Sequence, residues 1–175
     1  MKKKTLALVL ALTLLVAGVV GGTLAWLTDQ TAEVKNTFTV GDINIGLTET
    51  TADYKMVPGN TIAKDPTVTV KANSEACWLF VQVTESTNLK DFITYAIAEG
   101  WTELEAGVYY REVPASAADQ PFSVLAGDAV TVKSDVTRTM LETAKTDAPT
   151  LTFKAYAVQK DNVASASDAW AKVNP

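Results

Sequence analysis

The sequence lacks histidine altogether and has a single cysteine among its 175 residues. Without histidine, the chain can form neither an H-E-x-x-H zinc site nor a Ser-His-Asp or Cys-His catalytic arrangement. With Cys77 as the only cysteine, no disulfide can form within the chain, and its apolar, strand-like surroundings predict a buried, unreactive thiol. These absences remove the commonest hydrolase chemistry, so we predict that the protein is not an enzyme.

Acidic side chains are the remaining source of chemistry, since the chain has 20 aspartates and glutamates. Two pairs, Glu103 with Glu105 and Asp128 with Asp135, have the residue types of glycosidase carboxylates. All four fall at expected turns or strand ends, where acids are usually solvated, and we assign them no catalytic role. Loop carboxylates also suit Ca²⁺, but no D-x-D-x-D spacing is present. We therefore predict no cofactor and leave only calcium open.

The N-terminus has the features of an export signal. It is basic at its start, apolar and uncharged over residues 6–20, and then rich in small residues. We predict a signal peptide over residues 1–25 that is cleaved between Ala25 and Trp26. Cleavage would place the mature protein outside the cell, in the extracellular matrix or on the cell surface. The alternative is a permanent membrane anchor, because the uncharged segment 5–28 is long enough to cross a bilayer.

Cleavage would leave an acidic chain. Residues 1–25 contain three of the 15 basic residues and none of the acidic ones, so the mature chain has a net charge of −8. That charge argues against nucleic acids and anionic membranes as partners, and we expect membrane contact only through the uncleaved signal peptide. The remaining residues are enough for one stable core. We predict an N-terminal arm over residues 26–36 and a single β-domain over residues 37–175.

Short segments with alternating apolar residues, separated by turn residues, recur along this domain. The pattern predicts strands at residues 38–47, 67–71, 76–84 and 151–159, and hairpins over residues 101–113 and 122–133. It predicts helices at residues 89–97 and 136–144, and a helical turn at residues 167–173. The strand at 76–84 is apolar on both faces, which predicts a central strand covered on both sides. We therefore predict an all-β fold, an antiparallel two-sheet jelly-roll-like sandwich with one or two short inserted helices, preceded by a cleavable signal helix.

Three aromatic residues, Trp101, Tyr109 and Tyr110, fall in the predicted hairpin over residues 101–113. Together they could form a stacking platform for sugar rings. The alternative is that they pack across the strand pair and onto the sandwich. In a strand, one of the two adjacent tyrosines must face away from the other. We keep the three residues as the candidate ligand platform of a binding module.

Two segments near the N-terminus resemble a known family. GGTLAWLTD at residues 21–29 and NTFTVGDINI at residues 36–45 are similar to the start of TasA/camelysin-type proteins, which Gram-positive bacteria export through a SipW-like signal peptidase. Later segments follow the family order, among them KAYAVQ at residues 154–159. The resemblance implies a jelly-roll-like subunit of an extracellular fibre in a biofilm matrix, which polymerises by donor-strand complementation. Some members are described as metalloproteases, but a chain without histidine cannot form their H-E-x-x-H site.

The arm carries an amphipathic pattern that suits strand donation. In an extended arm, one face consists of alternate residues, here Trp26, Thr28, Gln30, Ala32 and Val34. An exposed sheet edge can pair with such an arm, and alternate side chains of the arm fill pockets. Head-to-tail contacts of this kind do not close, so they generate filaments. The alternative is that residues 26–35 form a disordered stub or the protein's own first strand.

Taken together, the residues and the resemblance predict a secreted structural subunit, major or accessory, of extracellular protein fibres in a bacterial biofilm matrix. Its partners would be copies of itself or homologous subunits, and a SipW-like signal peptidase that frees the arm. The alternative function is a monomeric cell-envelope module that binds glycan or protein ligands.

Overall fold

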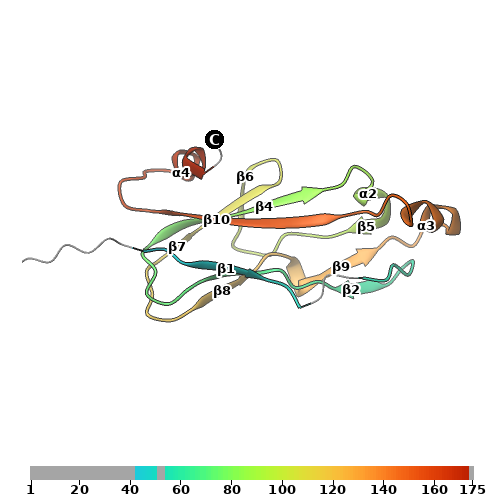
Figure 1. Ribbon diagram of the computed structural model, residues 1–175, viewed down its shortest axis with the longest axis horizontal. Coiled ribbons are helices and arrows are strands. Elements are labelled where there is room, and N and C mark those ends of the chain that lie inside the picture. The colour runs from blue at the N-terminus through green and yellow to red at the C-terminus, as the bar shows by residue number, and fades with distance from the viewer. Residues whose placement is uncertain (1–41, 51–53, 174–175) are drawn as a thin grey trace, which may run out of the picture. The chain divides into compact units, whose positions relative to one another are not determined.

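The computed structural model describes residues 42–50 and 54–173. The predicted signal peptide, its cleavage site between Ala25 and Trp26 and the arm at 26–36 lie outside these residues, as does the first part of the strand predicted over 38–47. The described part consists mainly of antiparallel β-strands with a few short helices (Figure 1), as predicted. None of its helices has the length and apolar character needed to cross a membrane.

Within the described residues the strands form three sheets, where the sequence predicted two. The first has the strand order β1-β3-β8, with β1 at Ile45–Thr48, β3 at Thr67–Val70 and β8 at Gln120–Ser123. The second has the order β10-β4-β7-β6, with β10 at Leu151–Gln159, β4 at Cys77–Glu85, β7 at Val108–Val113 and β6 at Thr102–Glu105. The third and smallest has the order β2-β9-β5, with β2 at Thr61–Ala63, β9 at Ala129–Val132 and β5 at Ile93–Thr94.

Short helical segments connect or cover these sheets. They are α2 at Leu89–Phe92, a 3-10 turn at Ala126–Asp128, α3 at Arg138–Ala144 and α4 at Ala166–Val173. At the start of α3 the side chain of Thr137 accepts a hydrogen bond from the Met140 N–H, which satisfies a donor that the helix itself leaves free. The helices predicted at residues 136–144 and 167–173 are therefore confirmed to within two residues.

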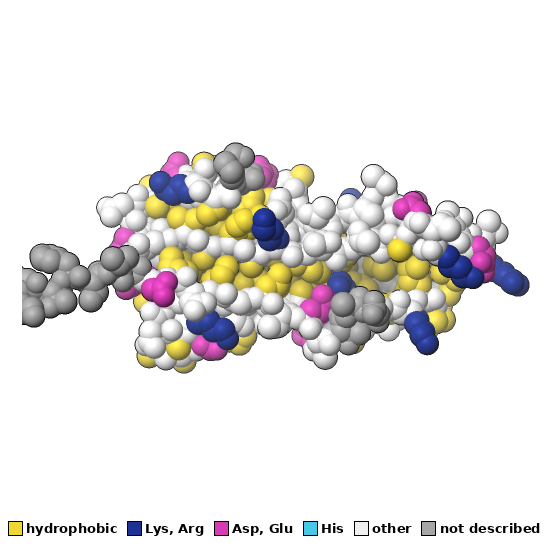
Figure 2. All heavy atoms as spheres, viewed as in Figure 1, with side chains coloured by type: hydrophobic (Ala, Val, Ile, Leu, Met, Phe, Trp, Pro, Cys, Tyr) yellow, Lys and Arg dark blue, Asp and Glu magenta, His cyan; other side chains and the backbone are white. Residues whose placement is uncertain are grey.

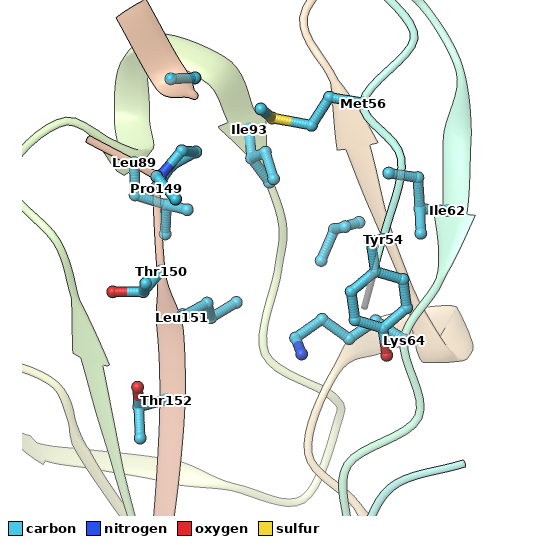
Figure 3. A pocket seen from close by; sticks show the side chains of 13 residues that line it. Tyr54, Met56, Ile62, Lys64, Leu89, Ile93, Pro149, Thr150, Leu151 and Thr152 are labelled. Atoms are coloured by element: carbon cyan, nitrogen blue, oxygen red, sulfur yellow. The ribbon is translucent and has the colours of Figure 1, made fainter. Parts of the chain in front are cut away.

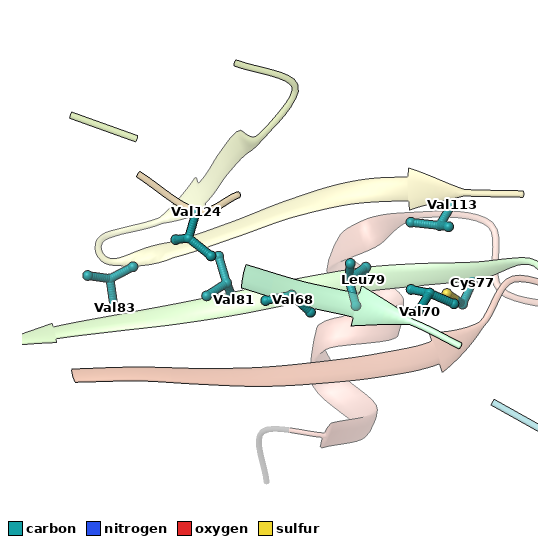
Figure 4. Close-up of a cluster of buried hydrophobic side chains, with 8 residues drawn as sticks. All are labelled: Val68, Val70, Cys77, Leu79, Val81, Val83, Val113 and Val124. Atoms are coloured by element: carbon teal, nitrogen blue, oxygen red, sulfur yellow. The ribbon is translucent and has the colours of Figure 1, made fainter. Parts of the chain in front are cut away.

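Strands of the first two sheets contribute side chains to one apolar core (Figure 4). β3 contributes Val68 and Val70, and β4 contributes Leu79 and Val81, all of them fully buried. The alternating sequence of β3 places both valines on one face of the strand. Burying each of these side chains is worth about 1.5–3 kcal/mol, so this cluster supplies a large share of the domain's stability.

The opposite face of β4 packs against α4. Trp78 and Phe80 point to this face, and the rings of Phe80 and Trp170 lie 5.3 Å apart. The indole N–H of Trp78 donates to the carbonyl of Val163 at 3.2 Å, and that of Trp170 donates to Glu105 at 2.7 Å. Both buried indoles therefore have the partner that burial demands. The prediction of a central strand covered on both faces is confirmed.

The helix predicted over residues 89–97 is wrong beyond its first turn. α2 ends at Phe92, and β5 follows immediately, with Ile93 pairing with Val132 of β9. The residues at positions 93 and 94 are β-branched, which favours a strand wherever a sheet edge is available. Pairing with a distant strand therefore overrides the local helical spacing.

The hairpin predicted over residues 122–133 does not form. β8 pairs with β3 in the first sheet, whereas β9 pairs with β2 and β5 in the third. The turn that contains Gly127, with φ of 66°, thus carries the chain from one sheet to another. The hairpin predicted over residues 101–113 is confirmed as β6–β7, with Ala106-Gly107 as a turn one residue shorter than expected.

Candidate functional site

β1 and β10 are edge strands that lie on the same side of the first two sheets. In the part of the chain that the structure describes, β1 pairs only with β3 and β10 pairs only with β4. The end of β1 and the start of β10 line one cavity of about 290 Å³, together with Glu49 and Pro66. We call the groove between the two strands the slot. It presents backbone N–H and C=O groups along two strand edges, which another strand can pair with.

Apolar side chains form the floor of the slot. Figure 2 shows a band of hydrophobic side chains between the positions of β10 and β1 in Figure 1. The side chains from these strands that pack on the core are only partly buried: Ile45, Leu151, Phe153, Ala155 and Ala157. At one end, Leu47 is 38% exposed. Core residues that remain exposed along a strand edge mark a surface suited to binding another chain.

The two strands that border the slot run in opposite directions. One end of the slot lies where Thr48 and Leu151 line the same cavity. At the other end of the slot, the first residue of β4, Cys77, pairs with Gln159, the last residue of β10. Two residues before β4, the Glu75 N–H donates a hydrogen bond to the carbonyl of Asp42 at 3.1 Å. Residues 42–44, which precede β1, therefore lie at the end of the slot opposite to Leu151.

A larger cavity of about 530 Å³ adjoins the Leu151 end of the slot (Figure 3). It shares Leu151 and Thr152 with the smaller cavity. Its wall is mostly apolar and includes Met56, Ile62, Leu89, Ile93, Val130 and Pro149. The cavity therefore offers room for an apolar side chain at the Leu151 end of the slot.

An ion pair lies at the junction of the two cavities, because Lys64 lines the larger and Glu49 the smaller. Lys64 is only 8% exposed, and its Nζ lies 2.6 Å from Glu49 Oε1, which also accepts a hydrogen bond from the Tyr54 hydroxyl at 2.7 Å. The same Nζ lies 4.9 Å from the ring centre of Tyr54 and 5.4 Å from that of Phe153. Burial, and then the Glu49 carboxylate, raise the pKa of Tyr54, so its hydroxyl remains a donor.

Side chains fill the opposite side of the same core. Trp101 Nε1 donates to the carbonyl of Ser123 at 2.9 Å. The guanidinium of Arg111 lies 3.9 Å from the ring centre of Phe122 and 5.3 Å from that of Trp101. Burial lowers the pKa of Arg111, and its Nε is buried without a hydrogen-bond partner among the described residues. The space between β7 and β8 is therefore occupied, whereas a cavity remains between the end of β1 and the start of β10.

The residues of the predicted ligand platform do not form one surface. Trp101 and Tyr109 pack against the core between the first two sheets. Tyr110 packs on the α4 side instead, with its ring 6.0 Å from that of Trp78 and 6.4 Å from that of Phe80. The two tyrosines thus face opposite ways, as adjacent residues of a strand must, so the three aromatics do not form the single platform that the sequence suggested.

The acids and the thiol considered above also have defined surroundings. Glu105 accepts the hydrogen bond of Trp170, and Glu103 lies opposite Tyr109 in the β6–β7 pair. Across the described ranges, no group of three or more metal-ligating residue types comes together. Cys77 is fully buried, as predicted, and burial raises its pKa to about 11.

The sequence pointed to only part of this site. The alternation of Leu151, Phe153, Ala155 and Ala157 along the last strand is a visible signal for an apolar face with small residues at one end. No local signal links Glu49 with Lys64, because the ion pair depends on the meeting of two separate segments. The donor-arm residues predicted between Trp26 and Val34 lie outside the described residues.

No protein-family model matches this sequence, and no curated protein or solved structure matches it significantly. The family resemblance therefore stands on the sequence motifs quoted above.

Proposed function

We propose that the protein is a secreted, non-catalytic structural subunit of extracellular fibres in a bacterial biofilm matrix. In this proposal the two facing sheets form a jelly-roll-like sandwich, and the mature N-terminal arm of one subunit inserts into the slot of the next. The observation that carries the proposal is the slot, where two strand edges border an apolar floor on one side of the core.

The length of the arm matches that of β10, the longer border of the slot. β10 has nine residues, about 30 Å at about 3.3 Å per residue, and the ten residues 26–35 span about 33 Å when extended. Trp26, Ala32 and Val34 would place apolar side chains on the floor, where Ala155 and Ala157 leave room. Backbone hydrogen bonds would supply the affinity of such a contact, and the side-chain pockets its specificity.

The placement of the first described residues suits a filament in this proposal. Asp42 lies near one end of the slot, and the larger cavity opens at the other. An arm that leaves one subunit and enters a different surface of the next makes a heterologous contact, which leads to an open filament when the rotation between subunits does not close. Cleavage between Ala25 and Trp26 by a SipW-like peptidase would control assembly, because an uncleaved arm stays tethered to the membrane.

Two variants with complementary defects test this proposal. Residues 36–175 retain the slot and lack the arm, whereas Ala155→Glu in residues 26–175 retains the arm and places a carboxylate on the floor of the slot. Each should stay monomeric in sedimentation and electron microscopy under conditions in which unmodified 26–175 polymerises. A mixture of the two should form a one-to-one dimer, because one can only accept and the other can only donate.

Lys154→Glu is the matched control, since it introduces the same residue on the exposed outer face of β10 and should leave polymerisation intact. Circular dichroism establishes that each variant is folded, and Ala157→Glu serves as a second blocked slot. Arm insertion is wrong if residues 36–175 polymerise as readily as residues 26–175, or if the folded complementary variants fail to combine. A folded, unmodified chain that stays monomeric at every concentration would favour the monomeric envelope module instead.

A further inference from the structure

A second recess lies at the turn of the β6–β7 hairpin, on the β7 side of β4, whereas the slot lies beyond β10. β4 runs past this hairpin, because β7 pairs with it only as far as Gln82 and the Val83 N–H donates to the Gly107 carbonyl at 2.7 Å. The protruding end of β4, the hairpin turn and Tyr95 line an open cleft of about 510 Å³. We call this recess the hairpin cleft.

An adjoining recess of about 370 Å³ extends the hairpin cleft toward β5. The two recesses share four lining residues, Glu85, Lys90, Tyr95 and Tyr109. Tyr109 belongs to the ligand platform predicted from the sequence. The second tyrosine of the cleft, Tyr95, comes from the segment 89–97 that was predicted to be a helix. The combined cleft therefore has the volume to receive more than one ring of a chain-like ligand.

Tyrosines and charged groups in the cleft are arranged around Glu85. The Tyr95 hydroxyl donates to Glu85 Oε1 at 2.8 Å, and Lys90 Nζ lies 3.1 Å from Glu85 Oε2. Burial, followed by the nearby Glu103 and Glu85 carboxylates, raises the pKa of Tyr109. Within the described residues, the Glu103 carboxylate itself has no hydrogen-bond or ion-pair partner. Glu103 thus presents a free acceptor beside an aromatic ring.

These groups suit a sugar better than an apolar or an anionic ligand. Tyrosine rings offer apolar faces to the C–H face of a pyranose and a hydroxyl to its edge, and carboxylates accept hydrogen bonds from sugar hydroxyls. Sites for apolar small molecules have predominantly hydrophobic walls, whereas this cleft is lined largely by polar side chains. Lys90 pairs with Glu85, but no cation of the described residues forms an ion pair with Glu103, so an acidic sugar would be repelled.

We propose that the hairpin cleft binds uncharged hexopyranose oligosaccharides, with Tyr95 and Tyr109 contacting the rings and Glu103 accepting sugar hydroxyls. This proposal does not depend on arm insertion, because the cleft and the slot lie on different sides of β4. A filament of such subunits would hold neutral polysaccharide at every repeat.

Calorimetric titration of residues 26–175 tests the proposal with three defined probes. Cellotetraose and chitotetraose are neutral hexopyranose tetramers, and tetragalacturonate is an acidic tetramer of the same length. At least one neutral tetramer should bind, and the acidic tetramer should not. Tyr109→Ala and Glu103→Ala should each weaken binding by about tenfold, as expected for the loss of one good contact to a charged or aromatic group.

Tyr110→Phe is the matched control, because Tyr110 is the neighbouring tyrosine on the opposite face of β7 and its change should leave the dissociation constant unaltered. Since Tyr109 is partly buried, Glu103→Ala and amide chemical-shift mapping decide the matter if Tyr109→Ala is unfolded. The proposal is overturned if neither neutral tetramer binds at millimolar concentration, if Glu103→Ala binds as tightly as the unmodified chain, or if the shifts lie away from residues 82–109. Repeating the titration with Ala155→Glu separates the two proposals, because a blocked slot leaves the hairpin cleft intact.

Discussion

The ion pair between Lys64 and Glu49 gives a quantitative test of how well the Leu151 end of the slot is shielded from water. The change is Glu49→Gln, which removes the negative charge but keeps an oxygen that can accept the hydrogen bond of Tyr54. The side chain of Lys64 is 10% exposed and that of Glu49 is 24% exposed. The variant would therefore leave a largely buried ammonium group without its carboxylate.

The cost of this change follows from the burial of the pair. Removing one partner of a fully buried pair destabilises a protein by about 3–5 kcal/mol, because the remaining charge loses its compensation. The partial exposure of Glu49 and the two aromatic rings near Lys64 reduce that cost, and we expect about 2–3 kcal/mol. For a domain of this size the melting temperature should fall by roughly 4–12 °C. Thermal unfolding and urea titration, both followed by circular dichroism, measure the two quantities.

Lys145 and Glu142 form the matched control. Their charged atoms have the same separation of 2.6 Å, but their side chains are 68% and 55% exposed. Glu142→Gln should cost less than about 0.5 kcal/mol, because water screens an exposed pair. Lys64→Met combined with Glu49→Gln should recover most of the loss, since no buried charge then remains. Equal losses in Glu49→Gln and Glu142→Gln would refute the burial argument.

Two further predictions concern the hairpin turn and the stability in acid. Gly107→Ala should be more destabilising than Gly59→Ala by about 1–3 kcal/mol. Both glycines have φ near 80°, but only at Gly107 would a Cβ meet another atom closely, at 2.7 Å from the carbonyl oxygen of Val83. Equal losses of stability in urea titration would contradict this steric explanation. Hydrogen bonds from Thr50 lower the pKa of Asp65 in the folded protein. The Asp65 carboxylate therefore stabilises the fold above about pH 4, and this stabilisation is lost as the pH falls through the lowered pKa. Asp65→Asn should therefore flatten the acid limb of the stability curve in thermal melts between about pH 2 and pH 6, and an unchanged limb would count against the Thr50 contact.

Local sequence pattern located the long elements well. β10 occupies the predicted residues 151–159, and β4 lies within one residue of 76–84, because both segments combine regular alternation with β-branched and aromatic side chains. The errors at residues 89–97 and 122–133 have a common cause. In both segments the chain pairs with a strand that is distant in sequence, and local spacing carries no information about that partner.

The candidate site was harder to predict than the elements, because it follows from the order of strands within the sheets. The apolar faces of β1 and β10 are visible in the sequence as alternating residues. Their position as neighbouring edges depends on β3 and β4 occupying the inner places, which is a property of the whole domain. The hairpin cleft likewise combines Tyr109, which the sequence had marked, with Tyr95 and Glu85, which come from segments with no shared local signal.

The two strands that border the slot come from opposite ends of the domain, β1 from its start and β10 from near its finish. A chain exported from its N-terminus would deliver residues 26–48 to the outside first and residues 151–159 among the last. The slot is therefore incomplete until β10 has paired with β4. Under the proposed mechanism a subunit could not receive an arm before its own β10 had paired, so fibre growth would wait for each chain to finish folding.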